Sequence, residues 1–273
     1  MKNSKIKEKV RQGYGKIARE GGSCCPGQSC CSTDLKAEDI SRDIGYGEAE
    51  MEAVPDGANL GLGCGNPIAA ASIKEGETII DLGSGAGFDS FLAANAAGKK
   101  GKVIGIDMTP DMIDKARKNA QKGGYGNVEF IQAEIEDIPL PDNTADIIIS
   151  NCVINLSPEK KKVFSEAYRL LKPGGRIMVS DIVLKKELPQ SVLGSIEAYV
   201  GCISGAEKME DYLGYIRDAG FNDVKILDET VFSLDNINKS QAFKDIIKSL
   251  DISDKDLGDA QESILSIKVS AIK

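Results

Sequence analysis

Histidine is absent from all 273 residues of the chain. A Ser-His-Asp triad, a Cys-His dyad, an imidazole base and a histidine-containing zinc site are therefore all excluded. Any chemistry of this protein must use thiols, carboxylates, hydroxyls, amines or a cofactor. Thiols are available, because the chain has seven cysteines.

Long apolar runs are also absent, since none approaches the roughly 18 residues that a membrane span requires. Residues 1–20, "MKNSKIKEKVRQGYGKIARE", lack the apolar core of a secretory signal. We expect a cytoplasmic protein, acting as a monomer without a membrane partner, in a reducing compartment where structural disulfides are rare. The net charge of −8 and the scattered lysines and arginines argue against nucleic acid as a partner.

The pattern from residue 77 onward predicts an α/β fold, because short apolar strands alternate with helices. The predicted strands are 78–82, 102–108, 128–134, 145–153 and 175–184, and the predicted helices between them are 87–98, 109–124 and 158–172. Such alternation gives βαβ units and a doubly wound, mostly parallel sheet. A helix at 208–219 and strands at 224–232 and 263–272 complete a seven-stranded, Rossmann-like sheet with an antiparallel edge strand.

The predicted organisation has two parts. Residues 1–75 form a cysteine-rich N-terminal segment with helices that cover the active site. The first of these helices, residues 3–19, carries an apolar stripe at helical spacing, made of Ile6, Val10, Tyr14 and Ile17. Residues 76–273 form the core, with helical insertions near 189–220 and 238–260.

The sequence "DLGSGAG", Asp81 to Gly87, follows a predicted strand and opens a predicted helix. Glycines allow a sharp turn and let backbone amides approach a ligand, and the helix N-terminus adds positive potential. Asp107 ends the next strand, where a carboxylate can accept both hydroxyls of a ribose. The dinucleotide fingerprint G-x-G-x-x-G is not matched, because Phe88 replaces its third glycine. The alternative is a purely structural turn beside a solvated acid.

This part of the chain resembles the class I S-adenosylmethionine-dependent methyltransferases, whose first motif is D-x-G-x-G-x-G. The resemblance implies S-adenosylmethionine as cofactor, with the glycines under its methionine part, Asp107 on the ribose and Met108 on the adenine. The implied cofactor site comprises Asp81, Gly83, Ser84, Gly85, Gly87, Asp107, Met108, Ile135, Glu136 and Asn151. The stretch "LLKPGGRIMVSD" is similar to the family's L-x-P-G-G before the fifth strand, and residues 173–175 are predicted to form a tight turn.

Three single cysteines lie where they can meet. Cys152 follows a strand at the carboxyl edge of the sheet, where open α/β sheets bind ligands. Cys64 lies in a glycine-rich loop before the first strand, and Cys202 follows a helix-like stretch after the fifth strand, so both can fold over that edge. A single cysteine is usually a small buried apolar residue. Asn66 and Asn151 adjoin the thiols, either as orienting residues or as turn and capping residues.

The local sequences "GLGCGNP", "SNCVINL" and "GCISGA" closely resemble the three cysteine motifs of the arsenite methyltransferases, a resemblance that runs from residue 13 to about 222. It implies that Cys64, Cys152 and Cys202 bind trivalent arsenic, delivered as arsenite or an arsenic-thiol conjugate, for methylation in arsenic detoxification. Trivalent arsenic is thiophilic, and its lone pair can attack the sulfonium methyl group without a general base. Positioning of the two reactants can supply roughly 7–11 kcal/mol.

Two other functions remain open on the sequence. A small-molecule C- or O-methyltransferase of the quinone or sterol type shares the cofactor motifs but has no need of three thiols. A non-catalytic metalloid- or zinc-binding protein uses the thiols alone, and three cysteines with a water suit zinc. The wide spacing of Cys64, Cys152 and Cys202, however, lacks the paired C-x-x-C of most zinc sites. Cofactor binding separates this second class of protein from both enzymes.

The segment "SCCPGQSCC", residues 23–31, holds the other four cysteines. Similar N-terminal cysteines occur in the arsenite methyltransferase family, where the resemblance implies a redox role. Methylation formally oxidises arsenic to the pentavalent state, so electrons must return it to the trivalent state. We predict that Cys30 or Cys31 exchanges with the Cys64 region and that thioredoxin or glutathione resets the disulfide. The alternative is a flap that captures arsenic, or a plain loop.

Overall fold

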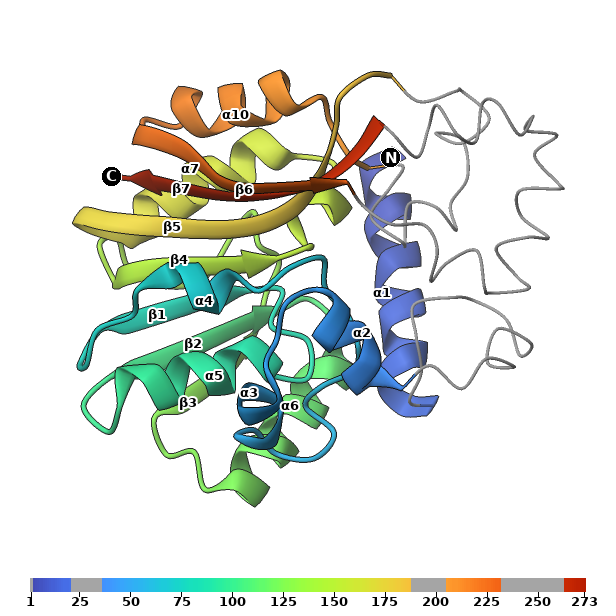
Figure 1. Cartoon of the computed structure of the whole chain (residues 1–273), viewed down its shortest axis with the longest axis vertical. Coiled ribbons are helices and arrows are strands. Elements are labelled where there is room, and N and C mark those ends of the chain that lie inside the picture. The colour runs from blue at the N-terminus through green and yellow to red at the C-terminus, as the bar shows by residue number, and fades with distance from the viewer. Residues whose placement is uncertain (1, 21–35, 188–204, 232–262) are drawn as a thin grey trace, which may run out of the picture.

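The computed structural model describes residues 2–20, 36–187, 205–231 and 263–273. They form a seven-stranded sheet with the strand order β3-β2-β1-β4-β5-β7-β6 (Figure 1). The strands are β1 (Thr78–Leu82), β2 (Lys102–Asp107), β3 (Val128–Gln132), β4 (Ala145–Asn151), β5 (Leu171–Leu184), β6 (Asn222–Val231) and β7 (Ile264–Ile272).

The pairing of the strands confirms the predicted fold class. β3, β2, β1, β4 and β5 pair in parallel, whereas β7 runs antiparallel to both β5 and β6. The antiparallel strand therefore lies one place in from the edge, which β6 forms. The last two strands pair with each other at the sheet edge, as their sequences predict.

Helices cover both faces of the sheet. α4 (Pro67–Ala71), α5 (Phe88–Ala97) and α6 (Pro110–Gly123) lie on one face, and α7 (Lys160–Leu170) and α10 (Met209–Asp218) lie on the other. Side chains of successive residues in β1 point to opposite faces of the sheet. Ile79 packs with α4 and α5, and Ile80 packs with α7 and α10. Among the described helices, none is long and apolar enough to cross a membrane.

Three short helices were not predicted: α2 (Ala37–Asp43), α3 (Glu48–Glu52) and the 3-10 helix Ile154–Leu156. The tight turn predicted at residues 173–175 is wrong. β5 includes these residues, and its pairing with β4 shifts from Ala145–Leu171 to Ile147–Arg176 across them. The extra residues form a bulge inside the strand, for which Gly174 supplies a positive φ of 78°.

The division into residues 1–75 and 76–273 stays a prediction. α10 belongs to the first predicted insertion, near 189–220. The rest of that helical region, from 188 to 204, and the second insertion near 238–260 lie outside the described residues.

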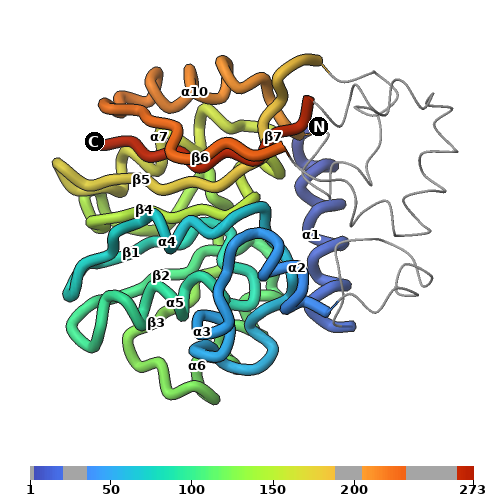
Figure 2. Tube along the Cα trace, in the orientation of Figure 1, coloured from blue at the N-terminus to red at the C-terminus, as the bar shows by residue number. Residues whose placement is uncertain are grey.

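Helix α1 (Lys2–Glu20) runs across the carboxyl ends of the parallel strands (Figure 1). Its predicted apolar stripe faces the sheet, because Val10 is 1% exposed and packs in one cluster with Ile182 and Ile264. Figure 2 shows the start of β7 beside this helix. The N-terminal helix therefore covers the edge of the sheet at which α/β proteins bind ligands.

A charged contact fastens α1 to that edge. Lys7 Nζ lies 2.7 Å from Glu134 Oε2 and 2.9 Å from Glu136 Oε1, and Glu159 lies at 3.8 Å. Burial lowers the pKa of Lys7, but the hydrogen bonds and charges of Glu134 and Glu136 outweigh it, so the pKa is raised. Glu136 is only 5% exposed, so Lys7 compensates a nearly buried carboxylate.

We expect Lys7→Met to lower the free energy of unfolding by about 1–3 kcal/mol, because it leaves the Glu136 carboxylate without its cation. Urea unfolding measures this change. Lys9→Met, on the exposed face of the same helix, is the control and should change stability little. Equal losses in the two variants would show that Lys7 contributes no more than an ordinary surface lysine.

Candidate functional site

The turn between β1 and α5 forms the first part of the site. Gly83, Gly85 and Gly87 all have positive φ, of 69°, 52° and 98°. A Cβ at Gly83 would collide with Val153, whereas the space beside Gly85 is open to 4 Å. Ser84 Oγ is buried and has no hydrogen-bond partner among the described residues. The turn thus offers an open glycine surface to a ligand.

Asp107 closes the other side of this cradle. Its Oδ2 accepts a hydrogen bond from the Gly85 amide at 3.0 Å, and its Oδ1 accepts one from the Thr109 amide at 2.8 Å. Burial raises the pKa of Asp107, and these backbone hydrogen bonds oppose the rise. Each oxygen can accept a further hydrogen bond, so the carboxylate suits a ribose diol. The cradle fits the adenosyl cofactor that the sequence predicts.

The three residues predicted to contact the adenine, Met108, Ile135 and Glu136, have different surroundings from one another. Met108 is half-buried against the cluster under α1, and Ile135 is buried in the main core. Glu136 Oε1 accepts a hydrogen bond from Ser157 Oγ at 2.5 Å and pairs with Lys7. Glu136 therefore anchors α1, and its predicted contact with adenine stays a prediction.

A buried hydrogen-bond network joins the cradle to the cysteine loop. The Tyr46 hydroxyl donates to Asp89 Oδ1 at 2.6 Å, and Nδ2 of the Asn151 side chain donates to Asp89 Oδ2 at 3.0 Å. Burial raises the pKa of Asp89 to about 6 despite these hydrogen bonds. Burial, followed by the charge of Asp89, also raises the pKa of Asp81, which accepts a hydrogen bond from Ser90 at 2.6 Å.

Asn151 links this network to Cys64. Its Oδ1 accepts a hydrogen bond from the Cys64 amide at 3.1 Å, and its Nδ2 donates to the Gly65 carbonyl at 2.8 Å. Asn66 has a different role, because its side chain accepts from the Ala69 amide at 3.0 Å and so caps α4. Of the two asparagines beside the thiols, Asn151 positions the cysteine loop and Asn66 is a capping residue.

The structure brings Cys64 and Cys152 together. Donor atoms from Cys64, Cys152 and Asp181 all lie within 4.8 Å of one another. The Cys152 amide donates to the Ser180 carbonyl at 2.8 Å, and the Cys64 thiol donates to the same oxygen at 3.6 Å. Cys152 has a φ of 58°, an uncommon backbone conformation that marks functional sites in many proteins. Val10 of α1 belongs to the same buried cluster as Cys64, and Cys152 packs against that cluster.

Asp181 is the residue at this site that the sequence analysis missed. It is fully buried in β5, and Tyr212 of α10 donates a hydrogen bond to its Oδ2 at 2.9 Å. Burial raises the pKa of Asp181 to about 7 against the hydrogen bonds of Tyr212 and the Ile182 amide. Its position at the end of "VSD", where the fifth strand reaches the carboxyl edge, was the available signal. Tyr46 and Asp89 carried no comparable signal.

The remaining predicted cysteines cannot be placed. Cys202, Cys30 and Cys31 lie outside the described residues, so their roles stay predictions.

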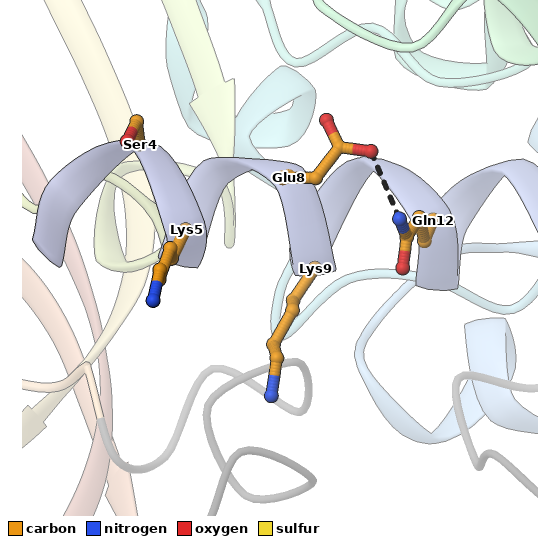
Figure 3. A pocket seen from close by; sticks show the side chains of 5 residues that line it. All are labelled: Ser4, Lys5, Glu8, Lys9 and Gln12. Atoms are coloured by element: carbon orange, nitrogen blue, oxygen red, sulfur yellow. Dashed lines mark hydrogen bonds between the residues drawn. The ribbon is translucent and has the colours of Figure 1, made fainter. Parts of the chain in front are cut away.

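The exposed face of α1 carries a separate hollow (Figure 3). It is lined by Ser4, Lys5, Glu8, Lys9 and Gln12. Gln12 donates a hydrogen bond to Glu8 at 2.9 Å, as the dashed line in Figure 3 shows. Neither a thiol nor a buried acid stands among these lining residues, so the candidate site is the one beneath α1.

Comparison with known proteins agrees with this geometry. A family model described as a methyltransferase domain matches residues 73–220, which include the glycine turn, Asp107, Cys152 and Asp181. Together with the strand order and the cradle, this match defines the chain as a class I methyltransferase.

Two similar proteins indicate which family of class I methyltransferases the chain belongs to. The arsenite methyltransferase of Halobacterium salinarum is 46% identical over 228 residues, which cover 81% of this chain and 58% of the relative. The crystal structure of an arsenic(III) S-adenosylmethionine methyltransferase from Chlamydomonas reinhardtii matches with 35% identity and a TM-score of 0.63, covering 86% of this chain and 73% of that chain. The chain belongs to the arsenite methyltransferase family.

The quinone alternative is less well supported. A ubiquinone/menaquinone biosynthesis C-methyltransferase of Escherichia fergusonii is 33% identical over 133 residues, which cover only 48% of this chain. The arsenite methyltransferases match a much larger share of the sequence, although this chain spans only 58–65% of the length of the first three curated relatives.

The raised pKa of Asp181 predicts a pH dependence of stability. Its pKa is about 7 in the folded protein against an ordinary value of 3.8, so the folded state keeps a proton that the unfolded state releases. Stability due to this group is therefore complete below the ordinary value and is lost as pH rises towards 7. We expect Asp181→Asn to flatten this decline by up to about 1.4 kcal/mol per pH unit.

Urea unfolding across that pH range measures the slope for wild type and variant. Asp146→Asn is the matched control, because hydrogen bonding to Lys172 holds the pKa of Asp146 below its ordinary value in spite of partial burial. Removing that carboxyl should leave the slope close to pH 7 unchanged, because a carboxyl with a lowered pKa is ionised there in both the folded and the unfolded state. Identical slopes for wild type and Asp181→Asn would mean that Asp181 titrates normally.

Proposed function

We propose that this chain transfers the methyl group of S-adenosylmethionine to thiol-bound trivalent arsenic, giving methylated arsenicals and S-adenosylhomocysteine. The observation that carries the proposal is the meeting of the Cys64 and Cys152 thiols at the carboxyl edge of the sheet. The glycine cradle and Asp107 lie at the same edge. A methyltransferase that acts on quinones or sterols has no need of paired thiols there.

The thiols bind arsenic by condensation. Each thiol replaces one hydroxyl of arsenous acid, an arsenic–sulfur bond forms, and the thiol proton leaves with the hydroxyl as water. Cys64 and Cys152 provide two sulfurs, and Cys202 is proposed to provide the third. Asn151 and the Ser180 carbonyl hold the first two in place before arsenic arrives.

The cofactor, when bound, supplies a sulfonium methyl group that the arsenic lone pair attacks. Gly85 leaves room for the methionine part, and Asp107 accepts the ribose hydroxyls. Helix α1 covers this edge and limits the access of water. Val10 attaches the helix through apolar packing, and Lys7 attaches it through its ion pair with Glu136. No residue has to remove a proton from the attacking atom, so the absence of histidine does not hinder the reaction. The chain contributes by positioning, which can supply roughly 7–11 kcal/mol.

The reaction leaves arsenic formally oxidised by two electrons. We assign its reduction to a cysteine pair, with Cys30 or Cys31 forming a disulfide that thioredoxin or glutathione reduces. A cytoplasmic, reducing compartment suits this thiol chemistry. A single copy of the chain carries the proposed ligands, so the proposal requires only a monomer.

A product assay tests the proposal. The protein is incubated with S-adenosylmethionine, arsenite and a thiol reductant, and arsenic species are separated and detected by mass. We expect methylated arsenic from the wild type and a loss of about 100-fold or more in Cys152→Ser, because one sulfur no longer holds the nucleophile in line. Cys24→Ser, which removes a thiol outside the proposed set, is the control. No methylated arsenic from a wild type that binds the cofactor would contradict the proposal.

The assignment of Asp107 predicts a selective loss of cofactor affinity. Asp107→Asn removes the negative charge that accepts the ribose hydroxyls, so we expect S-adenosylhomocysteine to bind about tenfold to a hundredfold more weakly by calorimetry. Retention of arsenite by the protein should not change. Asp114→Asn, an exposed acid on α6, controls for the charge change. Unaltered cofactor affinity in Asp107→Asn would remove Asp107 from the site.

A further inference from the structure

Asp181 adds an oxygen donor to the pair of thiols. One donor atom from each of Cys64, Cys152 and Asp181 lies within 4.8 Å of the other two. Thiolate sulfurs and carboxylate oxygens are both established ligands of zinc. We propose that Cys64, Cys152 and Asp181 form a binding site for a thiophilic divalent cation of the Zn²⁺ and Cd²⁺ class, which competes with arsenic for the same thiols.

The spacing of the donors suits such a cation. Tetrahedral zinc, with Zn–S near 2.3 Å and Zn–O near 2.0–2.2 Å, requires its donor atoms to be about 3.5–3.8 Å apart. Donors that already lie within 4.8 Å reach this separation by closing in by about 1 Å. A water or a further ligand completes the fourth position, as in catalytic zinc sites.

Neighbouring groups hold the three donors before a cation arrives. Tyr212 donates to Asp181 Oδ2, and the Ile182 amide donates to Oδ1 at 2.9 Å, which fixes the carboxylate and leaves a lone pair on each oxygen. Metal-binding carboxylates in proteins are commonly fixed by such hydrogen bonds. The Ser180 carbonyl restrains both cysteines in the same way.

Binding of the cation replaces protons on the donor atoms. The cation forms two bonds to sulfur and one to an Asp181 oxygen. The two thiol protons, and the carboxyl proton where Asp181 carries one, are released to solvent. Two thiolates and a carboxylate then surround the divalent charge, which offsets the cost of burying these anions. Asp181 is fully buried and Cys64 is 4% exposed, so this compensation matters.

The Asp181 carboxylate should bind the divalent cation but not trivalent arsenic. A divalent cation of this class accepts oxygen as well as sulfur, whereas trivalent arsenic favours sulfur alone. Loss of Asp181 should therefore weaken cation binding and leave arsenite binding intact. The cation needs no S-adenosylmethionine and no methyl transfer, so its binding stands or falls separately from the proposed reaction.

The experiment titrates Cd²⁺ into the full-length chain with Cys24, Cys25, Cys30 and Cys31 replaced by serine, so that the N-terminal thiols do not compete. The readout is the ultraviolet charge-transfer absorbance of cadmium–thiolate bonds, together with metal retained after gel filtration. We expect one Cd²⁺ per chain, displaced by arsenite. Cys64→Ser and Cys152→Ser should abolish the absorbance.

Two variants probe the oxygen donor. Asp181→Asn and the milder Tyr212→Phe should each weaken Cd²⁺ binding by about 10–100-fold, with arsenite retention unchanged. Asp146→Asn, distant from the thiols, should bind Cd²⁺ as before. Unchanged Cd²⁺ affinity in both site variants would overturn the proposal. Equal losses of Cd²⁺ and arsenite would also overturn it, because Asp181 would then organise the thiols without being a ligand.

Discussion

The carbonyl oxygen of Ser180 accepts hydrogen bonds from both the amide of Cys152 and the thiol of Cys64. One acceptor in β5 therefore sets the separation of two thiols that are far apart in the sequence. The parallel pairing of β4 and β5 places Asn151 opposite Ser180, and the Asn151 side chain draws in the Cys64 amide. The register of the sheet thus determines the geometry of the thiols, and the chemistry proposed for the site depends on it.

The edge of the sheet that carries these thiols is rich in buried acids. Burial raises the pKa of Asp89 to about 6 and that of Asp181 to about 7, while Tyr46 and Tyr212 each donate a hydrogen bond to one of them. The Lys7 ammonium, which attaches α1 to this edge, forms ion pairs with Glu134 and Glu136. An enclosed acidic edge favours positively charged ligands, and both a sulfonium cofactor and a divalent cation meet that condition.

The sequence predicted those parts of the molecule that local patterns encode. Alternating strands and helices, the glycine turn and the apolar stripe of α1 all follow from periodicity and turn chemistry, and the position of Cys152 follows from strand direction. The burial of Asp181 and Asp89 could not be predicted in the same way, because their hydrogen-bond partners Tyr212 and Tyr46 come from distant segments. Residues 173–175 have the composition of a turn, yet they form a bulge inside β5, between the β4 pairs made by Leu171 and Arg176. The roles of Cys202, Cys30 and Cys31 stay predictions, because these residues lie outside the described part of the chain.

In the proposed reaction, thiols from distant segments of the chain converge on one arsenic atom. X-ray absorption at the arsenic edge, on the wild-type protein loaded with arsenite, counts the atoms bound to arsenic and identifies them as sulfur or oxygen. We expect arsenic surrounded by sulfur alone in the wild type, and the loss of one sulfur in Cys64→Ser and in Cys152→Ser. Arsenic that keeps its oxygen ligands, or a sulfur count that neither substitution changes, would contradict it.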